Sequence, residues 1–355
     1  MTFEEEREIK LRIMLREKLE EFPDYVGDFT RGLTKATTNT KVAYLVDLRV
    51  FYRFLEEKIL LKPINNITLG DLEQVSARDI EIFLEFIGGY NKEDYTDKTI
   101  ITNTNNQRGK ARKLATLRSF YNYFYKRERI SNNPILIVDP PKIDDHNIVH
   151  LEPNETANLL DIIETGRGLT PKQLLSHSKV KTRDLAMVSL MLSTGIRVSE
   201  CIGINLEDID FNNNAVAITR KGKDKSIVYF GNEAEKALLE YIYERNIKEN
   251  KDHLKERDIN NPKPLFVTHK GTRIAVRTVQ DMVKKYSSLA VPLKNITPHK
   301  LRSTFGTTVY QETGDIYLVA DVLGHKDVNT TKKHYAKQQE SKKREISKLV
   351  RLRDA

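Results

Sequence analysis

The chain has 355 residues, of which 39% are hydrophobic and 31% charged, and its 59 Lys and Arg exceed its 50 Asp and Glu, for a net charge of +9. That length is more typical of two domains than of one core. No apolar run approaches the roughly 20 residues that span a bilayer, and the acidic, amphipathic N-terminus is unlike a signal peptide. The single cysteine, Cys201, excludes an internal disulfide and fits a reducing cytoplasm. The basic excess favours a polyanionic partner without requiring one.

The first 135 residues predict a helical domain. Apolar side chains at helical spacing favour helices over 3–21 and 38–58, from Ser76 to Gly88 and over 104–127, and the polar residues 90–105 predict a loop. Basic side chains lie along the first two thirds of the last helix: Arg108, Lys110, Arg112, Lys113 and Arg118. Two interpretations of this set remain open. Either the aliphatic stems cover a core while the charges stay in water, or the helix lies against duplex DNA, where cations displace counterions from phosphates.

Residues 136–150 predict an interdomain linker, because two consecutive prolines within it cannot continue a helix. The second domain is therefore expected over 151–355. It opens with a helix from Asn154, and a polar loop is expected over 166–180.

An almost wholly apolar stretch, 182–194, follows this loop. A helix that is apolar all round is typical of the middle of a domain. The stretch breaks at Gly195, so Arg197 leaves the interior on a tight turn. An arginine in that place indicates a functional role.

Two β-branched runs, AVAITR and SIVYF, predict a hairpin whose tip, 221–225, is basic. A lysine at a tip is normally solvated, but beside a phosphate site it could bring an ammonium group to a leaving oxygen. Helices over 232–247 and 276–289 and a short strand, 265–268, are also predicted. The sequence contains no glycine-rich phosphate loop, no HExxH motif and no Cys or carboxylate cluster with metal spacing, so we expect neither a metal nor another cofactor.

Residues 295–335 predict two short helices that carry a further polar set. Thr297 and Pro298 predict the N-cap and first position of one helix, and Gly324 is expected to end the next. The polar set is His299, Arg302, His325 and Tyr335. Arginine pairs donors to phosphate oxygens, histidine exchanges protons near neutral pH, and tyrosine can be a nucleophile. Each residue alone is more often an ordinary surface group, but the ordered set indicates attack of a phenol on a phosphodiester.

In chain order, this set and two upstream residues resemble the catalytic residues of the tyrosine recombinase (phage integrase) family, in particular its Xer-like bacterial members. The six matching residues are Arg197, Lys221, His299, Arg302, His325 and Tyr335. The resemblance is strong over about 180–340, through STGIRVSE, KGKDK, TPHKLRSTFGT and GDIYLVADVLGHKDVNTT, and weaker through RGKARKLATLRSFYNYF. Two positions depart from many members: Ser303 replaces a histidine, and the tyrosine follows the second histidine by ten residues instead of nine.

The resemblance implies a mainly α-helical protein with a small β-sheet, in which a helical DNA-binding domain and an α+β catalytic domain form a C-shaped clamp on duplex DNA. Four copies would assemble on two recombination sites, and the free chain would be a monomer or weakly associated. Strands would be exchanged through a four-way junction, in an Xer-like role in chromosome dimer resolution or in the integration and excision of a mobile element.

The resemblance also implies a role for each residue. Tyr335 would be the nucleophile and His299 the general base, while Lys221 would protonate the leaving oxygen. Arg197, Arg302 and His325 would bind the nonbridging phosphate oxygens. Glu200, one helical turn from Arg197, would orient an arginine or a histidine, with a plain helix ion pair as the alternative.

The sequence leaves two alternative functions open, and its C-terminal tail carries a separate expectation. A type IB topoisomerase-like enzyme would use the same tyrosyl chemistry as a monomer, and a DNA-binding accessory protein would have lost catalysis. The basic, amphipathic tail, 337–353, is expected to dock on a neighbouring copy or on its own domain.

Overall fold

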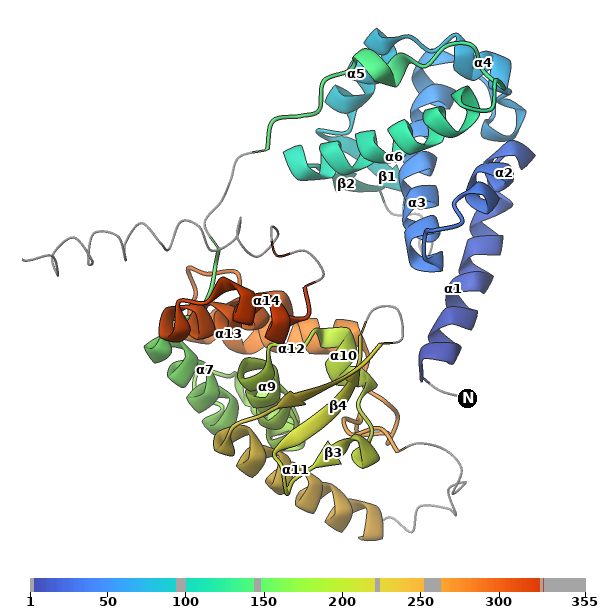
Figure 1. The fold of residues 1–355 in the computed structure, drawn as a ribbon. Helices are drawn as coiled ribbons and strands as arrows, with labels where there is room; N and C mark the ends of the chain where they lie inside the picture. Colours follow the sequence, from blue (N-terminus) through green and yellow to red (C-terminus); the bar gives the residue numbers. More distant parts are fainter. Residues whose placement is uncertain are drawn as a thin grey trace, which may run out of the picture. The chain divides into compact units, whose positions relative to one another are not determined.

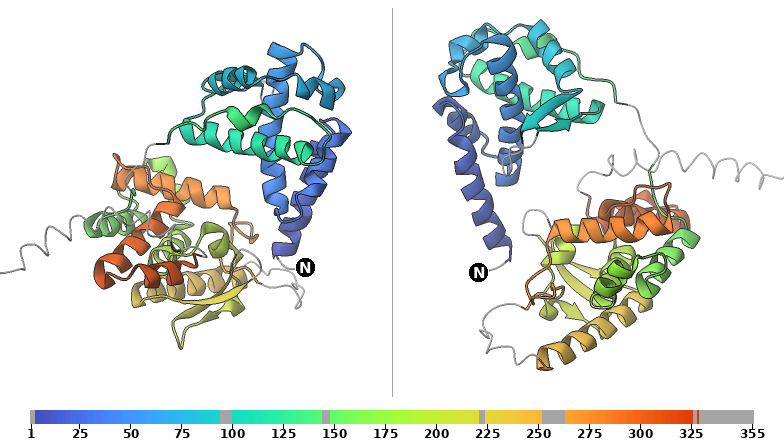
Figure 2. Two further views of the ribbon diagram at one scale, coloured as in Figure 1. Left: turned by 45° about the horizontal axis from the view of Figure 1, so that its top comes forward. Right: turned by 180° about the vertical axis from the view of Figure 1, so that it is seen from behind.

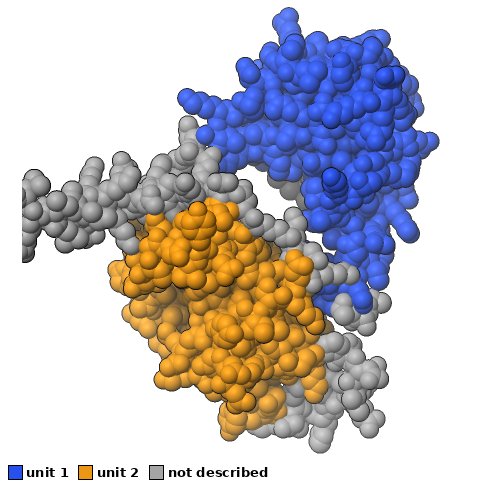
Figure 3. Space-filling view, viewed as in Figure 1, with its two compact units in different colours: residues 1–145 blue, residues 146–355 orange. Residues whose placement is uncertain are grey.

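The computed structural model describes residues 3–93, 100–143, 148–220, 224–251, 263–325 and residue 328. The chain forms two compact units, residues 1–145 and 146–355 (Figure 3). Each unit has its own buried apolar side chains, and each is described by itself below.

The N-terminal unit is built from helices around an aromatic core. Phe51, Tyr52, Phe83, Phe120 and Phe124 are fully buried, and most of their ring contacts are edge-to-face, the arrangement that the charge distribution of an aromatic ring favours. Its elements are α1 (Phe3–Leu19), α2 (Asp24–Gly32), α3 (Thr38–Phe54), a π-helical turn (Leu55–Ile59), a 3₁₀ turn (Ile64–Asn66), α4 (Leu69–Glu73), α5 (Ala77–Phe86), β1 (Tyr90–Glu93), β2 (Ile100–Asn103), α6 (Gln107–Tyr125) and a 3₁₀ turn (Pro134–Ile137).

Helix starts in this unit follow from side-chain caps. Ser76 caps α5 by accepting a hydrogen bond from the Asp79 backbone N–H, and the Asp79 carboxylate accepts in return from the Ser76 backbone N–H. Asn106 caps α6 through the Gly109 N–H.

The prediction of a loop over 90–105 was wrong, because β1 and β2 pair there as an antiparallel hairpin. The β-branched run of β2 was the available signal, but polar neighbours obscured it.

The C-terminal unit places helices around a three-stranded antiparallel sheet with the strand order β3-β4-β5. Its elements are α7 (Pro153–Thr165), α8 (Pro171–His177), α9 (Lys181–Thr194), α10 (Val198–Gly203), a 3₁₀ turn (Leu206–Asp208), β3 (Ile209–Asp210), β4 (Ala215–Thr219), β5 (Lys225–Tyr229), α11 (Asn232–Lys251), α12 (Val276–Ala290), α13 (Pro298–Thr313) and α14 (Ile316–Leu323). Helix α9 packs against α7, α11 and α13 and lies between the last two in Figure 1. Figure 2 shows that α12 and α13 lie on the opposite side of the unit from α11.

The prediction of a buried helix after residue 181 is confirmed by α9. Two of its three charged residues, Arg183 and Asp184, are buried: they form an ion pair at 2.6 Å, and the Tyr286 hydroxyl donates to Asp184 at 2.9 Å. Burial raises the pKa of Tyr286, which keeps this hydroxyl protonated as the donor. The charges of Arg183 and Asp184 are therefore paired with each other within the core, which offsets part of the cost of burying them.

Two local predictions for this unit were wrong. Residues 166–180 contain α8, which begins with a reciprocal cap between Thr170 and Gln173 and with Pro171 at its first position. Residues 265–268 form no strand: Val267 makes only an isolated bridge to Arg273.

Across the described ranges, no helix has the length and apolarity for a membrane crossing.

Candidate active site

Arg302 joins two segments that are distant in the sequence. It lies on α13, one turn after Pro298, and its neighbour Leu301 is fully buried. Its Nη1 donates to the Gly195 carbonyl at 2.6 Å, and its Nη2 donates to the Leu323 carbonyl. Arg302 is only 5% exposed. The planar guanidinium fork therefore links the turn after α9 to the end of α14. The expected capping bond from the Thr297 hydroxyl at the start of α13 is not formed.

The turn after α9 positions Arg197. Gly195 has φ +63°, closes α9 through its N–H to the Met191 carbonyl, and has no room for a Cβ because of the Phe305 ring. Arg197 then stands at the N-cap of α10, where its backbone N–H and its Nη1 each donate to Glu200 at 2.7 Å. The Glu200 side chain is 4% exposed, whereas that of Arg197 is 38% exposed. A buried carboxylate thus orients a guanidinium that remains accessible from outside.

The end of α14 positions His325. Asp315 caps the start of this helix by accepting from the Tyr317 and Leu318 N–H groups, and Gly324, with φ +60°, ends it. The His325 N–H donates to the Ala320 carbonyl at 2.8 Å, so its backbone is held in the helix-ending turn. The helix stop predicted at Gly324 is confirmed, and the half-buried His325 follows it directly.

The β4–β5 hairpin also reaches the end of α14. Antiparallel pairing runs from Ala215 opposite Tyr229 to Thr219 opposite Lys225, which confirms the predicted hairpin. Beyond that last pair, the Arg220 N–H donates to the Asp224 carbonyl at 2.8 Å. The Arg220 Nη2 donates to the Val322 carbonyl at 3.2 Å, and the pattern of basic residues in this hairpin did not single out Arg220.

The Arg302 side chain thus brings together three of the sequence motifs: the Gly195 turn, α13 and the end of α14. The Arg220 side chain attaches the hairpin to the end of α14. His299 lies in the first turn of α13 and is exposed, and its carbonyl accepts from the Ser303 hydroxyl at 3.1 Å. Lys221, Tyr335 and the tail 337–353 lie outside the described residues. Cys201 is fully buried beside this site, and burial raises the pKa of its thiol, in line with a packed rather than a reactive group.

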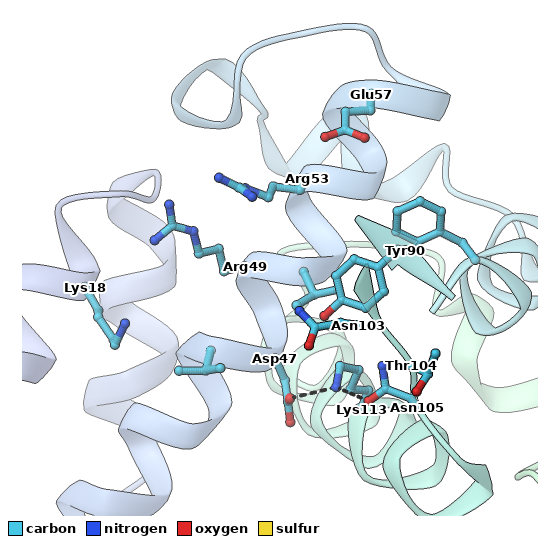
Figure 4. A pocket seen from close by; sticks show the side chains of 13 residues that line it. Lys18, Asp47, Arg49, Arg53, Glu57, Tyr90, Asn103, Thr104, Asn105 and Lys113 are labelled. Atoms are coloured by element: carbon cyan, nitrogen blue, oxygen red, sulfur yellow. Dashed lines mark hydrogen bonds and ion pairs between the residues drawn. The ribbon is translucent and has the colours of Figure 1, made fainter. Parts of the chain in front are cut away.

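The basic residues of α6 lie in the N-terminal unit and differ in environment. Arg112 donates to Asp47 at 2.6 Å. Lys113 is only 5% exposed, and its ammonium group donates to Asn105 at 2.8 Å and lies 3.7 Å from Asp47 (Figure 4). Burial raises the pKa of Asp47, and these two cations oppose that shift. Arg108 is exposed and Lys110 half-buried, while Arg118 donates to the Val138 carbonyl at 2.7 Å.

A pocket of about 260 Å³ lies beside Asp47, between α1, α3 and the β1–β2 hairpin. Figure 4 shows Arg49 and Arg53 on α3, Glu57 on the π-helical turn that follows it, and Lys18 across from them on α1. Arg49 forms an ion pair with Glu21. In the described part of the chain, no group of three or more His, Cys, Asp or Glu side chains could hold a metal ion.

Comparison with known proteins shows the family of this chain. The phage integrase family matches residues 150–342. The tyrosine recombinase XerC of Syntrophus aciditrophicus is 30% identical over 90% of this chain and 93% of that protein, and XerC of Caldanaerobacter subterraneus is 31% identical over 88% and 81%. A crystal structure of the XerH site-specific recombinase bound to palindromic difH substrate has the same fold, with a TM-score of 0.66 at 18% identity over 95% of this chain and 88% of that one. The chain belongs to the phage integrase family, as a relative of the Xer-type tyrosine recombinases.

Proposed function

We propose that this chain is a site-specific DNA recombinase that cleaves and rejoins duplex DNA through a 3′-phosphotyrosine intermediate. Strands would be exchanged between two sites through a four-way junction. The observation that carries this proposal is the pair of hydrogen bonds from Arg302, which hold the Arg197 turn and the His325 turn against α13. An arrangement that gathers two arginines and a histidine suits a phosphate whose negative charge increases during reaction.

The proposed cleavage is an attack by Tyr335 on the scissile phosphate. The phenol oxygen forms a bond to phosphorus, the bond to the 5′ oxygen breaks, and that oxygen leaves as a hydroxyl group. Free tyrosine has a pKa near 10, so its ionisation near pH 7 costs roughly 4 kcal/mol. His299 would accept the phenol proton, and Lys221 would give a proton to the leaving oxygen. The free 5′ hydroxyl can reverse the attack on either strand, so the step needs no ATP.

The transition state would be stabilised by preorganised donors. Arg197 and Arg302 would bind the nonbridging oxygens, and His325 would donate a further hydrogen bond. Removal of one such donor typically lowers the rate by roughly 100- to 1,000-fold. Glu200 would keep Arg197 in its binding orientation, which its two hydrogen bonds to that residue support.

The N-terminal residues 1–135 would form the domain that closes on DNA, joined by the linker 136–150 to the catalytic domain, 151–355. Arg108, Lys110, Arg112, Lys113 and Arg118 would supply the positive charge on α6. Four of them are exposed or half-buried and would contact phosphates. The buried Lys113 would act mainly by holding Asp47 and Asn105 in place beside them.

On DNA, we infer a homotetramer that spans two sites in the cytoplasm, formed from chains that are monomeric or weakly associated when free. The names of the curated relatives favour an Xer-like role in chromosome dimer resolution over the mobile-element alternative. The tail 337–353 would dock on the neighbouring copy. Unchanged assembly on DNA by a chain cut after residue 338 would count against that docking.

The proposed function is tested with a nicked suicide substrate, from which the cleaved strand diffuses away and traps the intermediate. The site comes from mapping the genomic DNA bound by the Tyr335→Phe variant, which should bind without cleaving. We expect a covalent adduct with the native protein and none with the variant. Equal adduct with both proteins, or none with either, would contradict the proposal. Relaxation of plasmids that lack the site would instead indicate a topoisomerase.

A further inference from the structure

The C-terminal end of α14 receives two arginines from different parts of the chain. The last carbonyls of a helix lack partners within the helix and need donors from elsewhere. Here Arg220 donates to the Val322 carbonyl at 3.2 Å, and Arg302 donates to the Leu323 carbonyl. Both guanidinium groups also lie at the negative end of the helix dipole, which favours cations. His325 lies two residues after Leu323, the second of these two acceptors.

The Arg220 guanidinium packs against the backbone at Gly324, the residue directly before His325. A Cβ at Gly324 would overlap the Nη1 atom of Arg220, so this glycine serves both the left-handed backbone and the close approach of the guanidinium. The Nε atom of Arg220 is buried and has no hydrogen-bond partner among the described residues. A buried N–H without a partner costs stability, so a gain elsewhere must account for its retention.

Arg220 also forms the base of the hairpin tip. Its N–H donates to the Asp224 carbonyl at 2.8 Å, one step beyond the pair of Thr219 and Lys225. Its backbone therefore fixes where the tip begins and ends, and its side chain fixes the same point to α14. Lys221 is the next residue in the sequence.

We propose that Arg220 is a positioning residue that ties the hairpin tip to the end of α14, so that Lys221 and His325 act on the same phosphate. This inference rests on the proposed function. Arg220 acts through Lys221, and its loss therefore impairs protonation of the leaving 5′ oxygen more than it impairs DNA binding. A leaving group that needs no proton makes Arg220 dispensable.

The test compares single-turnover cleavage of two suicide substrates that carry the same site. One has the ordinary phosphodiester, and the other has sulfur in place of the 5′ bridging oxygen, which leaves as a thiolate without a proton. Arg220→Ala is expected to cleave the ordinary substrate on the order of 100-fold more slowly than the native protein, the usual contribution of a general acid. On the sulfur substrate its rate is expected within a few-fold of native, at unchanged DNA affinity. Arg220→Lys, which keeps the charge and one donor, should restore part of the rate.

The matched control is Arg273→Ala. Arg273 also donates to backbone carbonyls, those of Ile202 at 2.7 Å and Ile204 at 3.0 Å, but at the end of α10. Its removal should lower the melting temperature and leave the ratio of the two cleavage rates unchanged. If Arg220→Ala is too unstable to assay, Gly324→Ala displaces the same guanidinium and should give the same preference for the sulfur substrate.

Equal loss of rate on both substrates in the Arg220 and Gly324 variants would overturn the inference while leaving the proposed function intact. A native protein that cleaves neither substrate would overturn the proposed function itself. A preference for sulfur that also appears in Arg273→Ala would show that general loosening of the domain, and not Arg220, sets the position of the acid, which also overturns the inference.

Discussion

At the scale of single residues, Arg302 explains why the site needs arginine and not merely a positive charge. Its two Nη atoms reach two carbonyls that lie on different segments, after α9 and at the end of α14. An ammonium group is a compact charge on a flexible stem and lacks the planar fork that spans both carbonyls. The residue is therefore structural and, under the proposed function, catalytic at once.

Arg302→Lys is expected to slow cleavage by roughly 100- to 1,000-fold with little change in DNA affinity, because a preorganised donor is lost while the charge stays. Single-turnover cleavage and a binding titration measure the two effects. Arg277→Lys is the matched control, since Arg277 pairs with Asp281 on the surface and its side chain is 81% exposed. A near-native cleavage rate in Arg302→Lys would contradict the role given to this guanidinium.

Glu200→Gln is expected to slow cleavage roughly tenfold, since misorientation of a catalytic group of this kind lowers the rate without abolishing it. The amide keeps the size of the side chain but can no longer accept from both the backbone N–H and the guanidinium of Arg197 as a carboxylate does. Fold and binding are followed by circular dichroism and titration. An unchanged cleavage rate would mean that Arg197 and Glu200 form an ordinary helix ion pair without a role in cleavage.

The local placement of these residues was largely predictable at this scale, but their convergence was not. Arg197, His299 and His325 were indicated because each lies within two residues of a glycine or proline that marks a helix end. Arg302 was indicated by its spacing of three from His299 on the same helix. Arg220 had no such marker. Its importance comes from a contact with Val322, 102 residues away, which no local pattern encodes.

At the scale of elements, the site depends on helix ends closed by glycines in the left-handed conformation. Gly195 and Gly314 both follow helices and have φ of +63° and +68°. They differ in their surroundings: a Cβ at Gly195 would overlap Phe305, whereas a Cβ at Gly314 would meet nothing within 4 Å. This difference allows backbone strain to be separated from packing.

Gly314→Ala is expected to lower the free energy of unfolding by about 1 to 2 kcal/mol, the cost of a left-handed backbone with a Cβ. Gly195→Ala should lower it further, by about 1 to 3 kcal/mol, because the methyl group also displaces the Phe305 ring. Denaturant unfolding of the two variants measures the difference. Equal destabilisation would mean that the turn after α9 adapts, and that its geometry is less constrained than we infer.

Elements with strong periodicity were predicted correctly, and weak ones were not. The apolar run of α9 and the hairpin of β4 and β5 could be predicted because burial or alternation governs them. The hairpin of β1 and β2 was missed because polar residues accompany its backbone pairing. Helix α8 was missed because its signal is the cap between Thr170 and Gln173, with few apolar residues behind it.

At the scale of the whole molecule, two units with separate cores divide the chain. The stability of the N-terminal unit should depend on acidic side chains that its caps and ion pairs hold ionised. Asp71 is one: hydrogen bonds from the Lys62 ammonium and from Thr68 lower its pKa from 3.8 to about 2. A lowered carboxyl pKa stabilises the folded state above the unfolded-state value, and the effect fades as the pH falls from there towards 2.

Asp71→Asn is therefore expected to lower the melting temperature at pH 7, with a loss of about 1 kcal/mol, the usual worth of a helix cap. The difference from the native protein should shrink below pH 4, be much reduced near pH 2, where the native carboxyl is about half protonated, and vanish below that pH. Thermal unfolding followed by circular dichroism across this pH range tests the expectation. Glu81→Gln, an exposed change on α5, is the control, and a gap that persists undiminished at pH 2 would contradict the assignment.

Under the proposed function, the Arg197, Arg302 and His325 segments together present a phosphodiester to Tyr335. To test this arrangement, the covalent DNA adduct is isolated and digested with trypsin and nuclease, and the phosphate is located by mass spectrometry. Trypsin cuts after Lys333 and Lys337, so Tyr335 falls in a peptide of four residues, HYAK. We expect a nucleotide joined through its 3′ phosphate to the tyrosine of this peptide. A nucleotide attached at any other residue, or through a 5′ phosphate, would contradict it.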